Sequence, residues 1–107
     1  MSEIGVEFFF VYRYKYMLKL FVEFIGTFIF FVVILQHGQA IPIGVALAAA
    51  IYFGGAVSGG NFNPGVSLMM FLKGTLSSSD FAQYVVVQCL AAFAAVYFNK
   101  LVPMIPK

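Results

Sequence analysis

The hydrophobic pattern of this chain consists of long apolar stretches separated by short polar breaks. Nearly continuous apolar residues cover positions 20–35, with a possible start as early as Met17, and again positions 41–57 and 81–102. Residues 36–39 form a polar connection between the first two stretches. A helix that crosses the hydrocarbon core of a bilayer needs about 20 predominantly apolar residues. The pattern therefore predicts three membrane-spanning helices.

A polar break interrupts the apolar sequence at residues 58–65, where glycine, asparagine and proline replace large apolar side chains. The apolar piece that follows is short. Counted over residues 64–72 it would rise about 14 Å as a helix, whereas the hydrocarbon core is about 30 Å thick. We therefore predict a re-entrant half-helix at about 63–72. Serine and aspartate at residues 77–80 then offer capping side chains before the third span.

These elements predict an all-α membrane protein with three transmembrane helices plus one re-entrant half-helix, and no linker or second domain. Residues 1–19 precede the first span and mix aromatic residues with Arg13 and Lys15, a composition typical of a membrane–water interface. This segment lacks the small-residue cleavage site of a secretory signal. The predicted organisation is an interfacial segment (1–19), a membrane unit (20–102) and a C-terminal tail (103–107).

Composition supports the membrane class and argues against several others. The 107 residues are 63% hydrophobic and 9% charged, with a mean hydropathy of +0.99. A soluble domain has about 25% charged residues. The net charge of +2 does not suggest a nucleic-acid partner. The single cysteine, Cys89, allows no intrachain disulfide, and no nucleophile–base cluster or metal-ligand spacing is present. The expected partner is the lipid bilayer, and neither enzyme activity nor a cofactor is expected.

Basic residues predict the orientation in the membrane. Three crossings place Arg13, Lys15, Lys19 and Lys73 on one side, and the remaining two lysines, at positions 100 and 107, on the other. Because loops rich in lysine and arginine tend to stay in the cytoplasm, the four-to-two bias favours a cytoplasmic N-terminus and a cytoplasmic loop after the half-helix.

The chemistry of the break suits a site for a neutral solute. Asparagine is a favoured N-cap and proline is favoured at the first helical position, so Asn63 and Pro64 are expected to start the half-helix. The two glycines at 59 and 60 allow carbonyl groups to turn toward a cavity. A free amide NH2 at the positive end of a helix suits a hydrogen-bonding solute and disfavours a cation or proton. The alternative is a capped loop that packs among helices and lines no pore.

The break resembles the first-half signature of the major intrinsic proteins, the aquaporins and glycerol facilitators. Their pattern is Ser-Gly-x-His-x-Asn-Pro-Ala-Val, and residues 58–66 read Ser-Gly-Gly-Asn-Phe-Asn-Pro-Gly-Val. Residues 23–27, Glu-Phe-Ile-Gly-Thr, resemble the family's Glu-x-x-Gly-Thr in the first helix. Tyr84 and Gln88 resemble its Tyr-x-x-x-Gln in the third. The similarity extends over about 21–98, in the expected order and spacing.

The resemblance implies roles for the residues of the break. Asn63 of the pore motif, which continues with Pro64 and Gly65, would donate a hydrogen bond to a passing solute. The backbone carbonyls implied to form a ladder of acceptors for that solute are those of Gly59, Gly60, Asn61 and Phe62.

Further roles fall on residues outside the break. The resemblance implies that Glu23 is buried and holds the re-entrant loop through its carboxylate, with Gln88 in the same loop-holding group. The alternative for Glu23 is an interfacial charge partnered by Lys19, four residues earlier. Ile43 aligns with the selectivity-filter position of the second helix, and ordinary packing is its alternative.

The chain departs from the family pattern at three of these positions. Gly65 stands where the family has alanine, which weakens the first turn of the half-helix. Asn61 replaces a histidine, and Ile43 replaces the usual aromatic residue of the filter. The choice between water, glycerol and other small neutral solutes is therefore left open.

Members of this family carry two inverted halves, and the sequence matches one of them. It contains no second Asn-Pro, and Arg13, its only arginine, does not correspond to the filter arginine of the family's second half. The first hypothesis is a channel half that needs a second-half chain or an inverted copy of itself, in an assembly that could resemble the family's tetramer. The charge bias argues against an inverted copy. The second hypothesis is a non-transporting, truncated module that associates with or regulates full-length channels.

Overall fold

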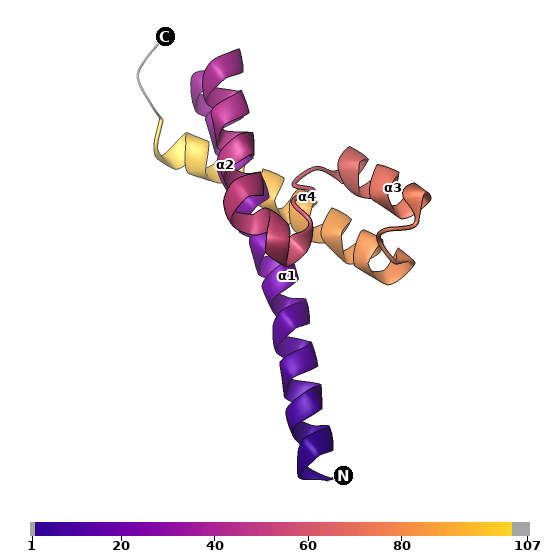
Figure 1. Ribbon diagram of the computed structural model, residues 1–107. Coiled ribbons are helices and arrows are strands. Elements are labelled where there is room, and N and C mark those ends of the chain that lie inside the picture. The colour runs from indigo at the N-terminus through magenta and orange to yellow at the C-terminus, as the bar shows by residue number, and fades with distance from the viewer. Residues whose placement is uncertain (1, 104–107) are drawn as a thin grey trace.

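A computed structural model describes residues 2–103 of the chain and contains four helices (Figure 1). They are α1 (Glu3–His37), α2 (Ala40–Ser58), α3 (Pro64–Lys73) and α4 (Ser78–Leu101). Residues 104–107, most of the predicted tail, lie outside the described residues. Three helices, α1, α2 and α4, are long and apolar enough to cross a membrane. The prediction of an all-α membrane protein with three spanning helices and a half-helix is confirmed.

The longest helix, α1, includes the segment that the sequence analysis separated from the first span. It begins directly after Ser2, whose Oγ accepts a hydrogen bond from the Gly5 N–H at 3.2 Å. Its 35 residues correspond to about 52 Å, well beyond a hydrocarbon core of about 30 Å. Figure 1 shows its N-terminal half projecting from the rest of the molecule. Residues 3–19 are therefore helical and continuous with the first span, because nothing in their sequence breaks the helix before it.

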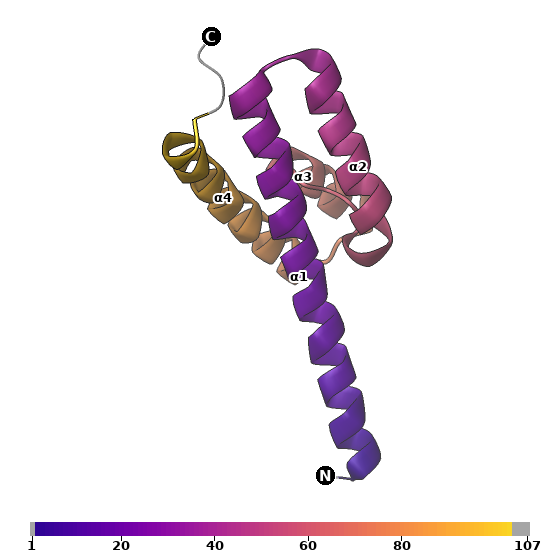
Figure 2. The ribbon, with the colours of Figure 1, turned by 90° about the vertical axis from the view of Figure 1, so that its left-hand side faces the viewer.

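The helices pack around α1. Figure 2 shows α1 between α4 and α2, and α1 is in contact with both. The half-helix α3 packs against α4, where the rings of Phe71 and Phe81 stack with centroids 5.1 Å apart. α3 ends at a left-handed Gly74, and the chain reverses into α4. With 10 residues, α3 is about 15 Å long, half of the hydrocarbon thickness.

The interior of this bundle is polar and its surface is apolar. Only four hydrophobic residues among those described are buried, whereas large side chains such as Tyr52 and Phe53 are more than 80% exposed. The buried positions of α4 repeat at helical spacing along one face that meets α1. This face is made of Tyr84, Gln88, Ala91 and Ala95. Small and polar residues between helices, with large apolar residues outside, are typical of helix packing in membranes.

Candidate functional site

The backbone between α2 and α3 turns sharply at two glycines. α2 ends at Ser58, and the following Gly59 and Gly60 have φ angles of 92° and 67°. The Gly59 N–H donates to the Gly55 carbonyl at 2.8 Å and closes the last turn of α2. Glycine takes such left-handed angles without steric cost because it has no Cβ. The chain therefore leaves the helix abruptly at the break that the sequence analysis singled out.

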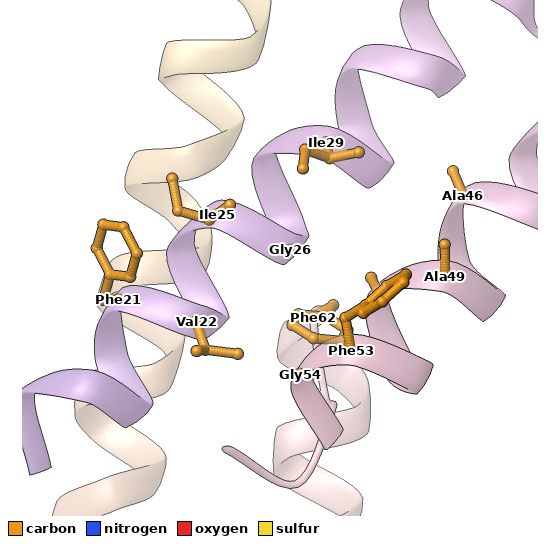
Figure 3. A pocket seen from close by; sticks show the side chains of 11 residues that line it. Phe21, Val22, Ile25, Gly26, Ile29, Ala46, Ala49, Phe53, Gly54 and Phe62 are labelled. Carbon is orange, nitrogen blue, oxygen red and sulfur yellow. The ribbon is translucent and has the colours of Figure 1, made fainter. Parts of the chain in front are cut away.

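Phe62 is a non-glycine residue in the same left-handed region, with φ of 55°. A residue with a Cβ loses about 1–2 kcal/mol in this conformation. Its ring is fully buried and lies between Gly26 of α1 and Gly54 of α2 (Figure 3). The ring also forms part of the wall of an apolar cavity of about 270 Å³ between these two helices. Close packing against two glycines offsets the backbone strain and anchors the loop to both helices.

The Glu23 carboxylate lies at the centre of a buried hydrogen-bond network and is itself fully buried. Its Oε2 accepts from Ser58 Oγ at 2.7 Å and from the Asn61 N–H at 3.1 Å. Its Oε1 accepts from the Phe62 N–H at 2.8 Å and from Gln88 Nε2 at 3.0 Å. All four partners are donors, which suits an ionised carboxylate because that group only accepts. The hydrogen bonds of Glu23 thus come from the end of α2, the loop and α4.

Two side chains one turn apart on α4 extend this network. Tyr84 Oη donates to the Ser58 carbonyl at 2.7 Å. Gln88 Nε2, besides its bond to the carboxylate on α1, donates to Ser67 Oγ of α3 at 2.8 Å. Ser67 Oγ also accepts from Asn61 Nδ2 at 2.9 Å. The network therefore connects the end of α2, the loop, α3 and α4 to one charge on α1.

The half-helix α3 starts with a complete N-cap. Asn63 has extended backbone angles, and its Oδ1 accepts from the Gly65 N–H at 2.7 Å. Pro64 occupies the first helical position, where its missing N–H costs nothing. The Ser67 N–H donates to the Asn63 carbonyl at 3.0 Å. Within residues 2–103, Asn63 Nδ2 takes part in no hydrogen bond, so the amide keeps its donors while its oxygen serves as the cap.

The structure brings most of the sequence-predicted residues together and leaves one apart. Glu23, Gln88 and the loop residues 59–62 meet around the network, and the Asn-Pro-Gly motif follows directly. Ile43 lies in the first turn of α2 and is half-buried. It precedes Ser58 by fifteen residues, or about 22 Å along the helix axis. Ile43 is therefore at the opposite end of α2 from the network.

Comparison with known proteins identifies the family. The family model described as major intrinsic protein matches residues 36–105, which include α2, the loop, α3 and α4. This chain belongs to the major intrinsic protein family. No solved structure matches it significantly.

Several curated relatives are major intrinsic proteins by name. The glycerol uptake facilitator protein-like 6 of Lactiplantibacillus plantarum is 33% identical over 88 residues, which cover 74% of this chain and 41% of that protein. Human aquaporin-9 is 42% identical over 86 residues, covering 66% and 29%. Aquaporin Z of Brucella melitensis is 41% identical over 58 residues, covering 54% and 25%. The chain thus spans between a quarter and about two fifths of the length of these relatives. The family is one of channels and not of enzymes.

Sequence reasoning missed part of the network of this major intrinsic protein. Ser67 accepts two hydrogen bonds, and the side chain of Phe62, rather than its carbonyl alone, anchors the loop. Ser67 could have been found as the small polar residue in an otherwise apolar half-helix. Tyr84 could have been assigned a contact, because it lies four residues before Gln88 and therefore on the same face of α4. No local signal indicates that the Phe62 ring enters the space between two glycines on different helices.

The Tyr84 hydroxyl provides a test of the network that leaves Glu23 intact. Replacing Tyr84 with phenylalanine removes the donor to the Ser58 carbonyl and is expected to lower the free energy of unfolding by about 1–2 kcal/mol. The measurement is detergent-induced unfolding followed by circular dichroism. Tyr97→Phe is the matched control, because Tyr97 is 67% exposed on the same helix. Removing its hydroxyl should lower the free energy of unfolding by less than about 0.5 kcal/mol. Equal effects of the two substitutions would contradict a structural role for the hydroxyl.

Proposed function

We propose that this chain supplies one half of an aquaporin-like channel for passive transport of water or small neutral solutes. The observation that carries the proposal is the capped half-helix α3, which begins at the Glu23-bound loop with the Asn63 amide NH2 unused. An interrupted helix at membrane depth is tolerated where the freed backbone groups line a cavity or are buried in protein. Membership of a channel family and the spacing of the motif support the cavity.

The loop offers backbone carbonyl acceptors next to the amide NH2 donor of Asn63. The N–H groups of Asn61 and Phe62 are engaged by the Glu23 carboxylate. In the described part of the chain, no hydrogen bond reaches the carbonyls of residues 59–62. We infer that these carbonyls, followed by the Asn63 amide, form the path of the solute. A row of acceptors ending at a donor and at the positive end of α3 suits a neutral solute that both donates and accepts, and disfavours cations.

A complete pore needs parts beyond this one half-repeat. A second half-repeat, on a second-half chain or on an inverted copy of this one, would supply the opposing half-helix and the filter arginine. Ile43, at the far end of α2 from the break, would contribute to the selectivity filter. The four basic residues, three near the N-terminus and Lys73 at the end of α3, would face the cytoplasm.

Permeability of reconstituted liposomes tests the proposal. The chain is reconstituted alone and together with a candidate second-half chain, and the rate of osmotic volume change is followed by light scattering. We expect water or small-polyol permeability above that of empty liposomes in at least one preparation. Background rates in both would overturn the channel proposal. If permeability stays at the level of empty liposomes and a full-length channel copurifies with this chain, the alternative is favoured. That alternative is a non-transporting module that binds or regulates such channels.

Asn63→Asp tests whether this side chain contacts the solute. Aspartate is as good an N-cap as asparagine, so α3 should still begin at the same residue. The substitution removes the free amide donor and places a charge at membrane depth, so permeability of the conducting preparation should fall by about tenfold or more, or its rejection of ions should change. Asn99→Asp, near the C-terminal end of α4, makes the same chemical change away from the loop and should leave flux unaltered. Unchanged flux and ion rejection in Asn63→Asp would exclude Asn63 from the path.

A further inference from the structure

A second polar site lies away from the loop, between the N-terminal half of α1 and the first turns of α4. It is a pocket of about 520 Å³. Among the residues that line it are Tyr12, Arg13 and Tyr16 of α1, and Ser79, Asp80 and Gln83 of α4. The pocket contains one cationic and one anionic side chain, so its lining carries no net formal charge. None of these residues belongs to the network around Glu23.

The depth of this pocket corresponds to the lipid headgroups. α3 is a half-span, so the loop from which it starts, and Glu23 that binds this loop, lie near the middle of the bilayer. Arg13 precedes Glu23 by ten residues, which is about 15 Å along α1 and equals half of a hydrocarbon core of about 30 Å. Tyrosine and arginine are also the residues expected at this level.

The two charged side chains are available to a ligand. The Arg13 guanidinium lies over the ring of Phe9, 5.9 Å from its centroid. In the described residues no hydrogen bond involves the N–H groups of this guanidinium, so they can donate to an anion. At the start of α4 the cap is Ser77, whose Oγ accepts from the Asp80 N–H, so the Asp80 carboxylate is not needed for capping. No hydrogen bond joins Arg13 to Asp80 in the part of the chain that the structure describes.

An apolar stripe continues from the pocket toward the middle of the membrane. Arg13, Met17 and Phe21 are spaced four residues apart and therefore follow one face of α1. Met17 is 64% exposed and Phe21 is 62% exposed. A ligand with a charged head at Arg13 can thus lay a hydrocarbon chain along these two side chains. This continuity favours a lipid over a soluble molecule with the same head.

We propose that this pocket binds the zwitterionic headgroup of a phospholipid, with the phosphate at Arg13 and the cationic amine at Asp80. The guanidinium edge donates charge-assisted hydrogen bonds to phosphate oxygens. The Asp80 carboxylate attracts the amine, and the rings of Tyr12 and Tyr16, stacked with centroids 6.4 Å apart, offer an aromatic surface beside the cation. An anionic lipid with an uncharged head alcohol would leave Asp80 without a counter-charge. The proposal does not depend on pore formation.

Lipid retention measured by native mass spectrometry tests this site. The protein in detergent is titrated with phosphatidylethanolamine and with phosphatidylglycerol of identical acyl chains. We expect the wild type to retain the zwitterionic lipid about tenfold more strongly, the ratio that corresponds to one additional charge contact. Asp80→Asn should abolish this preference, and Arg13→Gln should weaken retention of both lipids about tenfold. Circular dichroism checks that each variant is helical.

Matched controls separate the pocket from general electrostatics. Lys15→Gln removes the same charge from α1 two residues away, and Glu7→Gln removes a carboxylate outside the pocket, so both should retain the wild-type preference. Loss of retention in Lys15→Gln equal to that in Arg13→Gln would overturn the site. Equal or stronger retention of phosphatidylglycerol by the wild type would overturn it whether or not the variants fold. Displacement of the lipid by equimolar glycerophosphoethanolamine would show that the headgroup alone binds, and would overturn the lipid as occupant.

Discussion

Replacing Glu23 with glutamine is expected to be among the most destabilising single substitutions in this chain. The carboxylate accepts four hydrogen bonds, from Ser58, Asn61, Phe62 and Gln88. An amide of the same shape turns an NH2 group toward these donors and removes the charge that all of them share. We expect the free energy of unfolding to fall by about 3 kcal/mol, since breaking a buried charged network leaves its remaining polar groups unpaired.

The loss of stability in Glu23→Gln should be concentrated in the loop between α2 and α3. Hydrogen–deuterium exchange of the Asn61 and Phe62 amides, together with detergent-induced unfolding, measures it. Glu7→Gln is the matched control, because Glu7 is exposed on the same helix and its substitution should change stability by less than about 0.5 kcal/mol. If Glu23→Gln unfolds like the wild type and keeps the two amides protected, the network does not hold the loop.

Replacing Gly26 with alanine is expected to displace the loop by pushing on the Phe62 ring, whereas Glu23→Gln acts by removing hydrogen bonds. A Cβ at Gly26 would lie 2.8 Å from Phe62 Cζ, and closer still to Cδ1 and Cε1 of the same ring. The ring cannot withdraw easily, because it lies against Gly54 on its other side. Overpacking of this kind costs about 1–3 kcal/mol. Because the ring anchors the loop, we also expect faster exchange of the Phe62 amide and, in a conducting preparation, lower permeability.

Gly44→Ala is the matched control for the overpacking expected in Gly26→Ala. Gly44 is also a helical glycine, and a Cβ there would meet no atom within 4 Å. The control variant should be neutral or more stable by up to about 1 kcal/mol, the difference in helix propensity between alanine and glycine. The double variant Gly26→Ala with Phe62→Leu should recover most of the stability, because the smaller side chain frees the space. A Gly26→Ala protein as stable as Gly44→Ala would mean that the two helices can separate without cost.

The elements of this protein follow from local sequence properties. Apolar stretches of sufficient length predicted three spanning helices, and helix-capping chemistry at Asn63 and Pro64 indicated where the short helix begins. These signals are readable because each depends on residues that are close together in the sequence: a run of about 20 apolar residues for a span, and a single turn for a helix cap. The extent of α1 was not foreseen, since aromatic and basic residues are compatible with both an interfacial segment and a continuous helix. The family was recognisable from the spacing of the motif, and the comparison with known proteins confirmed it.

The contacts of the candidate site were less accessible to sequence reasoning. The resemblance implied a link between Glu23 and the loop. Which donors reach the carboxylate was decided by how α1 lies against the end of α2, the loop and α4. Ser67 and Gln88, 21 residues apart, meet because α3 packs back on α4. The role of the Phe62 ring depends on where Gly26 and Gly54 lie in space, and neither the motif glycine Gly26 nor Gly54 indicates from the sequence which ring it contacts.

The sequence by itself determined the membrane class, the number of spanning helices, the half-helix and the family, because these depend on the length of apolar runs and on local backbone chemistry. Only the tertiary structure decided which donors surround the Glu23 carboxylate, which ring anchors the loop, and that Arg13 and Asp80 share a pocket. These contacts join residues distant in the chain, and their geometry depends on how the helices cross. A buried charge can be satisfied by several sets of partners, and packing selects one of them.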